Sequence, residues 1–302
     1  MSQAAVYPLS ACAQLALSLG LVLGLNACNL EQELELDLPE FRGEPLVECF
    51  LSPGQPFSLL LTQSAGYFDE VRLDTLGVLH DILLNGAEVS IRYGDERVQL
   101  VNAPFVNPLT RQVGNYVAPQ LVPYNYQDSF YLEVNLPSGR GRLLAATKLL
   151  AEVPMDSNVV EFPLPGQPRE NKARLVTYLT DPDAGSSNYF RKILRYDMAE
   201  RQSLRQDFVL TDELSPGGQL FTFTFFDFSP LDTLLVLNVH VGEEFERWQT
   251  SVDAAVLSNG NPFAQPSTLV GNVRGAREEV RGTGIFSAYT VASERVVIPE
   301  RE

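Results

Sequence analysis

The chain is poor in the side chains that most often carry catalysis, with three cysteines, two histidines and one tryptophan among 302 residues. His80 and His240 lie far apart and form no H-E-x-x-H pattern, so we expect a structural role for each. A P-loop, a G-x-S-x-G elbow and a dinucleotide-binding G-x-G-x-x-G are also missing. These absences predict a protein that is not an enzyme, with no catalytic residue, no metal site and no cofactor.

Cysteine usage excludes two further classes of protein. If Cys12 is removed with a signal segment and Cys28 is modified, Cys49 stands alone, so neither a disulfide framework nor a zinc site built on cysteine pairs can form. Cys49 lies in the apolar run LVECFL. We predict that it is a small buried hydrophobic residue.

Positive charge is also scarce, because 22 Lys and Arg residues face 38 Asp and Glu residues and the formal net charge is −16. Residues 1–27 contain none of these four residue types, so all of this charge belongs to the part that follows. A body this acidic repels nucleic acid and anionic lipid surfaces. We therefore predict no nucleic-acid partner.

The sequence contains no apolar run of 18 residues, and its longest such stretch is the 11-residue Leu15–Leu25. This run is too short to cross a hydrocarbon core of about 30 Å as a helix, but it suits the apolar region of a signal peptide. It leads into Leu25, Asn26, Ala27 and Cys28, which resemble the lipobox of bacterial lipoproteins. Two features depart from that pattern: Asn26, two residues before Cys28, and the absence of Lys or Arg from residues 1–14. We predict a signal peptide over 1–27, cleavage between Ala27 and Cys28, and acylation of Cys28, for example by palmitate, which anchors the chain in outer-membrane lipid.

An acidic segment follows Cys28 and occupies residues 28–43. Its carboxylates alternate with leucines, which permits either an extended tether or a strand; they are Glu31, Glu33, Glu35 and Asp37. Such a cluster behind a lipidated cysteine resembles the surface-export signal of Bacteroidetes lipoproteins. We therefore expect a tether and an outer-membrane location that is surface-exposed rather than periplasmic.

From residue 44 onward the pattern predicts a mainly β fold. Short runs rich in β-branched and aromatic residues, such as FSLLLTQS and SFYLEVNL, are separated by turn formers such as Asn85-Gly86 and Gly94-Asp95. The sequence predicts an N-terminal immunoglobulin-like β-sandwich over 44–153. A proline-rich linker over 154–172 and a second antiparallel β domain over 173–302 follow.

The second β domain is expected to carry one helix near 243–258, because Phe245, Trp248, Val252 and Val256 recur at near-helical spacing. Trp248 is predicted to seat this helix on the sheet. In FTFTFFDF, the residues Phe221, Phe223 and Phe225 share one face of a strand, and we expect that face to lie in the core. Asp181, Asp183 and Asn188 are assigned to a turn, because position 192 is Lys where a calcium loop needs Glu.

Several segments in order resemble a Bacteroidetes outer-membrane lipoprotein family, domain of unknown function 4249. The most specific are NPFAQPSTLVGNV and GTGIFSAY, and similar words include LVECFLSPGQPFSLLLTQSAGYFDE, SFYLEVNLPSGRGRLLAATKLLAEVPMDS and DPDAGSSNYFRKILRY. The resemblance spans about residues 28–298. REEVRG at 277–282 interrupts the family pattern, and Phe190 replaces its second tyrosine.

The family resemblance implies a lipid-anchored lipoprotein without assigned catalysis, often encoded beside a TonB-dependent receptor. We therefore expect a non-enzymatic accessory or ligand-binding partner of a TonB-dependent transporter. A structural or adhesive envelope protein that mediates protein–protein contacts is the alternative, and a hydrolase with an unrecognised site is a third.

Overall fold

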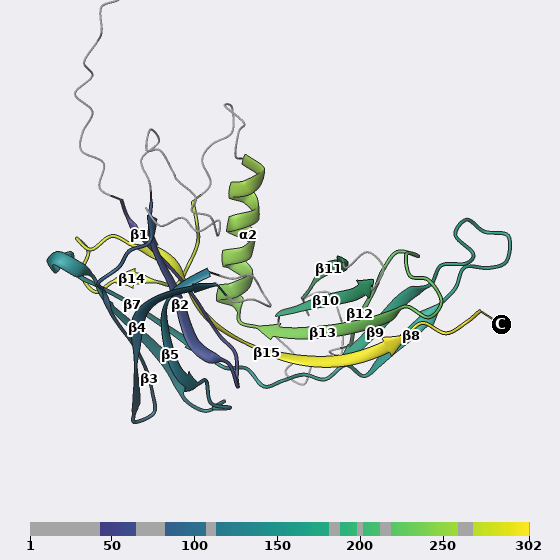
Figure 1. The fold of residues 1–302 in the computed structure, drawn as a ribbon, viewed down its shortest axis with the longest axis horizontal. Coiled ribbons are helices and arrows are strands. Elements are labelled where there is room, and N and C mark those ends of the chain that lie inside the picture. The colour runs from purple at the N-terminus through teal and green to yellow at the C-terminus, as the bar shows by residue number, and fades with distance from the viewer. Residues whose placement is uncertain are drawn as a thin grey trace, which may run out of the picture. The chain divides into compact units, whose positions relative to one another are not determined.

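Alternating apolar and polar residues form β-strands along most of the chain, and the fold is mainly β with one α-helix (Figure 1). The computed structural model describes residues 43–64, 82–106, 113–180, 188–197, 202–211, 219–258 and 268–301. The strands are β1 (Pro45–Leu51), β2 (Pro56–Gln63), β3 (Glu88–Tyr93), β4 (Glu96–Val106), β5 (Val113–Leu121), β6 (Ser129–Asn135), β7 (Arg142–Lys148), β8 (Ser157–Glu161), β9 (Arg174–Thr180), β10 (Asn188–Asp197), β11 (Gln202–Thr211), β12 (Gln219–Phe223), β13 (Thr233–Val241), β14 (Arg274–Gly275) and β15 (Thr283–Val297). The helices are the short 3₁₀ turn η2 (Pro137–Gly139) and α2 (Glu243–Ser258).

The strands form a large mixed sheet and a small antiparallel one. The twelve-stranded sheet has the order β11-β10-β13-β15-β1-β2-β5-β4-β3-β6-β7-β14, and the three-stranded sheet has the order β12-β9-β8. Strand β4 pairs with β3 through residues 96–100 and, beyond them, with β5 through residues 101–106. It therefore passes from one layer of the N-terminal half to the other.

The first core lies between these two layers. Its buried residues alternate along the strands, as expected for a sheet with one covered face. The largest fully buried side chains in it are Tyr116, Phe57, Phe130 and Phe286. Cys49 belongs to the same cluster and donates from Sγ to Ser58 O at 3.3 Å, which confirms the prediction of a small buried residue.

Strand β15 joins both halves of the described chain. Its first part pairs with β1 in parallel, from Leu46 opposite Thr283 onward, and its second part pairs antiparallel with β13. The parallel approach requires glycine at position 284, where φ is +140° and a Cβ would lie 2.0 Å from the Val47 carbonyl oxygen. Sequence patterns do not predict this pairing, because it joins residues at opposite ends of the chain.

A second core lies between the three-stranded sheet and the β13–β15 part of the large sheet. It contains Leu175, Phe228, Leu234, Val236 and Val296. The predicted linker, residues 154–172, contains β8, which pairs with β9. Strand β15 contributes residues to both cores, and residues 42–302 cluster as one unit. The division into two domains, residues 44–153 and 173–302, stays a prediction.

Strand β12 shows the opposite orientation to the one predicted. The expectation that Phe221, Phe223 and Phe225 face the core is wrong: all three are more than half exposed, whereas Thr222 and Thr224 are buried. The inward face is set by Leu220, which packs with Val153 and Leu179 in a small apolar cluster. Once Leu220 points inward, the two-residue period of a strand places the odd-numbered phenylalanines on the outer face.

Helix α2 covers the predicted residues 243–258, and its first half packs on the large sheet. Trp248 is buried as predicted, and the Phe245 ring meets Phe50 of β1 edge-on at 5.5 Å. The Glu244 side chain accepts hydrogen bonds from the Thr147 and Ser287 hydroxyls at 2.9 and 3.1 Å. Val256, expected on the same apolar face, is 68% exposed, because the buried residues of the helix, Trp248 and Ser251, lie before its last two turns.

Glu48 lies on the β1 face that carries Phe50, and burial raises the pKa of its carboxyl above the ordinary value. A carboxyl whose folded pKa is raised favours the folded state below the unfolded pKa, and this contribution is lost as the pH rises through the folded pKa. We expect Glu48→Gln to raise the urea midpoint at about pH 7 and to leave it nearly unchanged at about pH 3, where glutamate is almost fully protonated and neither side chain is charged. Urea titrations at the two pH values test this, and an equal shift at both would contradict it.

Candidate functional site

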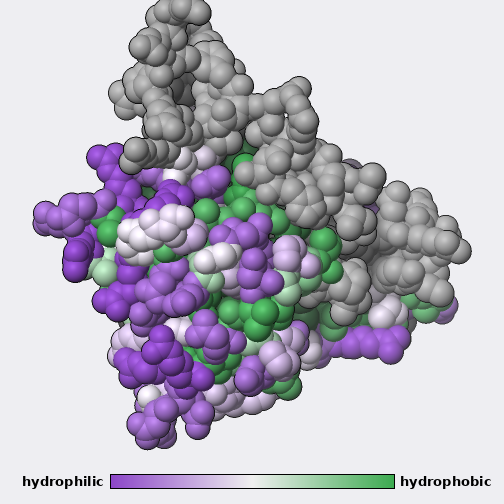
Figure 2. Space-filling view, turned by 60° about the vertical axis from the view of Figure 1, so that its left-hand side comes forward, coloured by the Kyte–Doolittle hydropathy of each residue, from purple (hydrophilic) through white to green (hydrophobic). Residues whose placement is uncertain are grey.

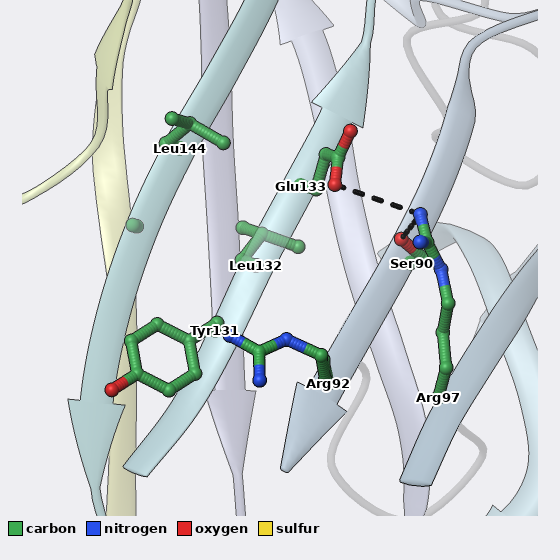
Figure 3. A pocket seen from close by; sticks show the side chains of 8 residues that line it. Ser90, Arg92, Arg97, Tyr131, Leu132, Glu133 and Leu144 are labelled. Atoms are coloured by element: carbon green, nitrogen blue, oxygen red, sulfur yellow. Dashed lines mark hydrogen bonds and ion pairs between the residues drawn. The ribbon is translucent and has the colours of Figure 1, made fainter. Parts of the chain in front are cut away.

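A small pocket opens on the solvent-facing side of β3, β4, β6 and β7, in the N-terminal half (Figure 3). Its volume is about 210 Å³, and the residues that line it are Ser90, Arg92, Arg97, Tyr131, Leu132, Glu133, Leu144 and Ala145. Strand pairing brings the polar side chains together, because Arg92 is the Cα partner of both Arg97 and Tyr131, and Ser90 is the partner of Glu133. Each of these strands buries other residues in the first core, and this packing holds the backbone beneath the pocket in place.

Two arginines lie directly opposite each other on neighbouring strands, an arrangement that like charges disfavour. They avoid each other by turning to different partners, as Figure 3 shows. Arg97 donates to the Ser90 hydroxyl at 2.9 Å and pairs with Glu133 at 3.5 Å, and Arg142 pairs with the same carboxylate at 3.1 Å. The Arg92 guanidinium lies 4.7 Å from the centre of the Tyr131 ring.

This set of groups offers hydrogen-bond donors and apolar surface to a ligand. No carboxylate in the described part of the chain pairs with Arg92, so this guanidinium has hydrogen-bond donors available for an anionic group of a ligand. Leu144 and Tyr131 supply apolar surface beside it. The Ser90 hydroxyl accepts a hydrogen bond from Arg97, and no histidine is among the residues that line the pocket.

We expect Glu133→Gln to lower the free energy of unfolding by only about 0.5–1 kcal/mol, because both arginines are more than a third exposed and water screens the pairs. The difference should vanish at about 1 M salt, where the screening length falls to about 3 Å. Urea titrations at low and high salt measure both values. Glu88→Gln is the matched control, since Glu88 forms no ion pair with another described residue; a salt-independent loss specific to Glu133 would show that the pairs are not its cause.

The residues predicted to carry lipidation and export lie outside the described part of the chain. They are Ala27, Cys28, Glu31, Glu33, Glu35 and Asp37, and their assignments stay predictions. His80, Asp181 and Asp183 also lie outside it, while the backbone of Asn188 begins β10. No helix among the described residues is long and apolar enough to cross a membrane.

His240 in β13 is buried, and its Nδ1 lies 2.7 Å from the Ala151 carbonyl oxygen. The Thr290 hydroxyl donates to the same carbonyl at 3.3 Å, so these contacts tie the segment after β7 to the β13–β15 pair. The contacts fit the structural role expected for this histidine.

Burial raises the pKa of the Cys49 thiol, which keeps it protonated and unreactive. Within the described ranges, no three His, Cys, Asp or Glu side chains are grouped as a metal site needs.

Sequence reasoning did not identify the pocket, although one signal was available. Gly94-Asp95, predicted as a hairpin turn, is a two-residue loop between paired Tyr93 and Glu96. A two-residue loop makes the flanking Arg92 and Arg97 cross-strand partners, so RYGDER already contains this arginine pair. Tyr131 and Glu133 come from a distant strand, and only the β3–β6 pairing adds them.

Hydrophilic and hydrophobic residues are unevenly distributed over the face of the molecule that Figure 2 shows. In Figure 2, hydrophilic residues predominate on the left and lower parts of the visible described surface, and hydrophobic residues gather towards its middle. Apolar surface is therefore concentrated on parts of this face.

Comparisons with known proteins place the chain in a family without showing an activity. No curated protein matches it. A solved structure titled a cytokine receptor complex has 9% identity and a TM-score of 0.24, covering 83% of this chain and 95% of that chain. A DUF4785 family protein from Legionella pneumophila subsp. pneumophila str. Philadelphia 1 has 14% identity and a TM-score of 0.23, covering 65% and 52%. TM-scores this low bear neither on the fold nor on the function. The model of one family matches residues 31–295, and this chain therefore belongs to that family, described as a domain of unknown function (DUF4249).

Proposed function

We propose that this protein is a lipid-anchored, non-enzymatic lipoprotein of the outer membrane, exposed at the cell surface, that binds a partner or ligand beside a TonB-dependent transporter. The observation that carries the proposal is the apolar run Leu15–Leu25, which leads into Leu25-Asn26-Ala27-Cys28 and is followed, after an acidic segment, by a β-rich body. The acidic segment after Cys28 supports export to the surface.

A binding role agrees with the chemistry of the described body. The pocket is lined by arginines, a carboxylate and an aromatic ring placed on β-strands. Such groups recognise a partner through hydrogen bonds and apolar contact. The transporter is proposed as the partner because the family that the motifs resemble is often encoded beside such receptors.

Co-purification tests the proposed partnership. The full-length chain, carrying a C-terminal tag and expressed from its own locus, is isolated from outer membranes solubilised in mild detergent after brief crosslinking. We expect a TonB-dependent receptor in near-stoichiometric amount. An unrelated tagged lipoprotein from the same membrane is the control. Recovery of this chain without a receptor, while other envelope proteins are captured, would overturn the transporter role.

A structural or adhesive envelope protein is the second candidate function. The β-rich body with exposed aromatic side chains favours it, since such surfaces are common where proteins meet. Deletion of the gene separates the two functions: slower nutrient uptake supports the transporter role, whereas normal uptake with altered surface assembly supports the adhesive one.

A further inference from the structure

Aromatic side chains gather on the outer side of the three-stranded sheet. Phe221, Phe223 and Phe225 are 61%, 51% and 75% exposed, and Tyr178 of the neighbouring β9 is 41% exposed. We call these four residues the aromatic face. Tyr178 and Phe221 are Cα partners, and their ring centres lie 6.2 Å apart with a tilt of 32°.

An arginine extends the aromatic face at one end. The Arg174 guanidinium lies 5.2 Å from the Phe223 ring centre and 5.1 Å from that of Phe226, and it pairs with Glu161 at 2.7 Å. Val176, the Cα partner of Phe223, is buried in the same strand pair. The rings therefore stand on a packed surface and are held by neighbours, which lowers the entropy lost when a partner covers them.

Exposing these rings is costly, and no folding requirement explains it. Single exposed apolar residues are common, but a contiguous group of large aromatic side chains on one sheet face marks an interaction site in soluble proteins. Folding fixes only the inner face through Leu220, Thr222 and Thr224, so threonine or lysine on the outer face would satisfy the same strand. The outer rings therefore point to a partner.

We propose that the aromatic face is the docking surface for a partner protein, which covers it with apolar side chains set in a neutral or basic surround. This inference rests on the proposed binding role and names the surface that performs it. Aromatic residues and arginine are the types enriched at the centre of protein–protein interfaces, where a few of them supply most of the affinity.

The charges at the border of the face indicate what kind of protein fits. Arg174 is paired with Glu161, and Arg169 with Asp227 at 2.5 Å, so the border is locally balanced. The chain as a whole carries −16, so a second copy would bring an equal negative charge and be repelled. A neutral or basic partner meets no such repulsion.

Two other classes of occupant fit less well. Residues that sit at a membrane interface are mainly tryptophan and tyrosine, whose polar tips reach water, whereas this face is mainly phenylalanine. A glycan needs polar groups beside the rings to bind its hydroxyls, but at the Phe223 end of the face the Arg174 and Glu161 side chains already bind each other.

Photo-crosslinking in living cells tests the docking surface. The full chain carries p-benzoylphenylalanine at position 223 or, as a control, at position 124 in the N-terminal half, where Tyr124 is 69% exposed. We expect irradiation to give one discrete product with a single other protein from position 223 and none from position 124. A product that contains two copies of this chain, or only lipid or glycan adducts, would overturn the inference.

Affinity for the crosslinked protein, purified, supplies the second measurement. We expect the triple variant F221T/F223T/F225T to bind at least about 30-fold more weakly than wild type, a loss typical of aromatic residues at an interface centre. Threonine keeps the strand propensity, and a wild-type-like urea midpoint verifies the fold. The matched control V101T/L121T/Y124T removes apolar side chains that are 62%, 56% and 69% exposed elsewhere, and should bind within about 3-fold of wild type.

The outcomes separate this inference from the proposed function. If the triple variant and wild type bind the partner equally, the aromatic face is not the docking surface and the binding role stands. If neither wild type nor the control variant binds any outer-membrane protein, both proposals fall.

Discussion

Replacing Cys28 with alanine is expected to move the protein from the membrane fraction to the soluble fraction and to abolish its labelling by palmitate. Each buried methylene of an acyl chain contributes about 0.8 kcal/mol, so two or more chains anchor a protein stably and their loss removes the anchor. No described helix of this chain is long and apolar enough to replace it. Growth with an alkyne analogue of palmitate, followed by fractionation and gel detection of the tagged chain, measures both effects.

Cys49→Ala is the matched control for the lipidation experiment, because it removes a thiol that is buried in the first core. Palmitate labelling and membrane association should both persist in this variant. A Cys28→Ala protein that still carries palmitate and stays with the membrane would show that the anchor lies elsewhere, and would overturn the lipoprotein assignment.

Replacing Asn115 with alanine is expected to lower the free energy of unfolding by about 2–3 kcal/mol. The side chain is fully buried and connects β5 to two other segments. Its Oδ1 accepts from Leu61 N at 2.8 Å, and its Nδ2 donates to Leu61 O at 2.9 Å and to Leu84 O at 3.2 Å. Truncation leaves the Leu61 N–H without this acceptor, and a buried unsatisfied group costs about 1–3 kcal/mol. The two carbonyls each lose one hydrogen bond but keep another, Leu61 O from Leu84 N and Leu84 O from the Tyr116 hydroxyl.

Urea unfolding followed by circular dichroism gives the stability change at position 115. Asn102→Ala is a suitable control, because Asn102 also bonds Asn115 O and Asn85 but lies at the surface, and we expect it to cost less than about 1 kcal/mol. A loss below about 1 kcal/mol for Asn115→Ala would show that water replaces the lost amide.

The sequence predicts the strands and the helix well, because both depend on local periodicity. The α-helix spans the predicted residues 243–258, and the predicted runs FSLLLTQS and SFYLEVNL match β2 and β6 to within one residue at each end. Strand β5 was not predicted, since its sequence VGNYVAPQL mixes glycine, asparagine and proline with apolar residues. Asn115 in this strand is buried and bonds the backbone of Leu61 in β2 and of Leu84. The sequence does not predict these bonds, because they join segments that are distant along the chain.

The candidate sites depended more strongly on the tertiary structure. The arginine pair of the pocket is encoded by the two-residue turn, but Tyr131 and Glu133 reach it through pairing with a strand about 40 residues away. For the aromatic face, the two-residue period correctly separates Phe221, Phe223 and Phe225 from Thr222 and Thr224. It does not say which set is buried, because that depends on which side of the sheet another layer covers.

The sequence alone therefore determined the properties that are local or additive: the mainly β class, the helix, the buried cysteine and the acidity of the body. Only the tertiary structure decided the properties that arise from contacts between distant segments: the parallel pairing of β1 with β15, the buried amide of Asn115 and the outward orientation of the phenylalanines. A strand pattern defines two faces but not their surroundings, and burial of one face is a property of the neighbouring layer.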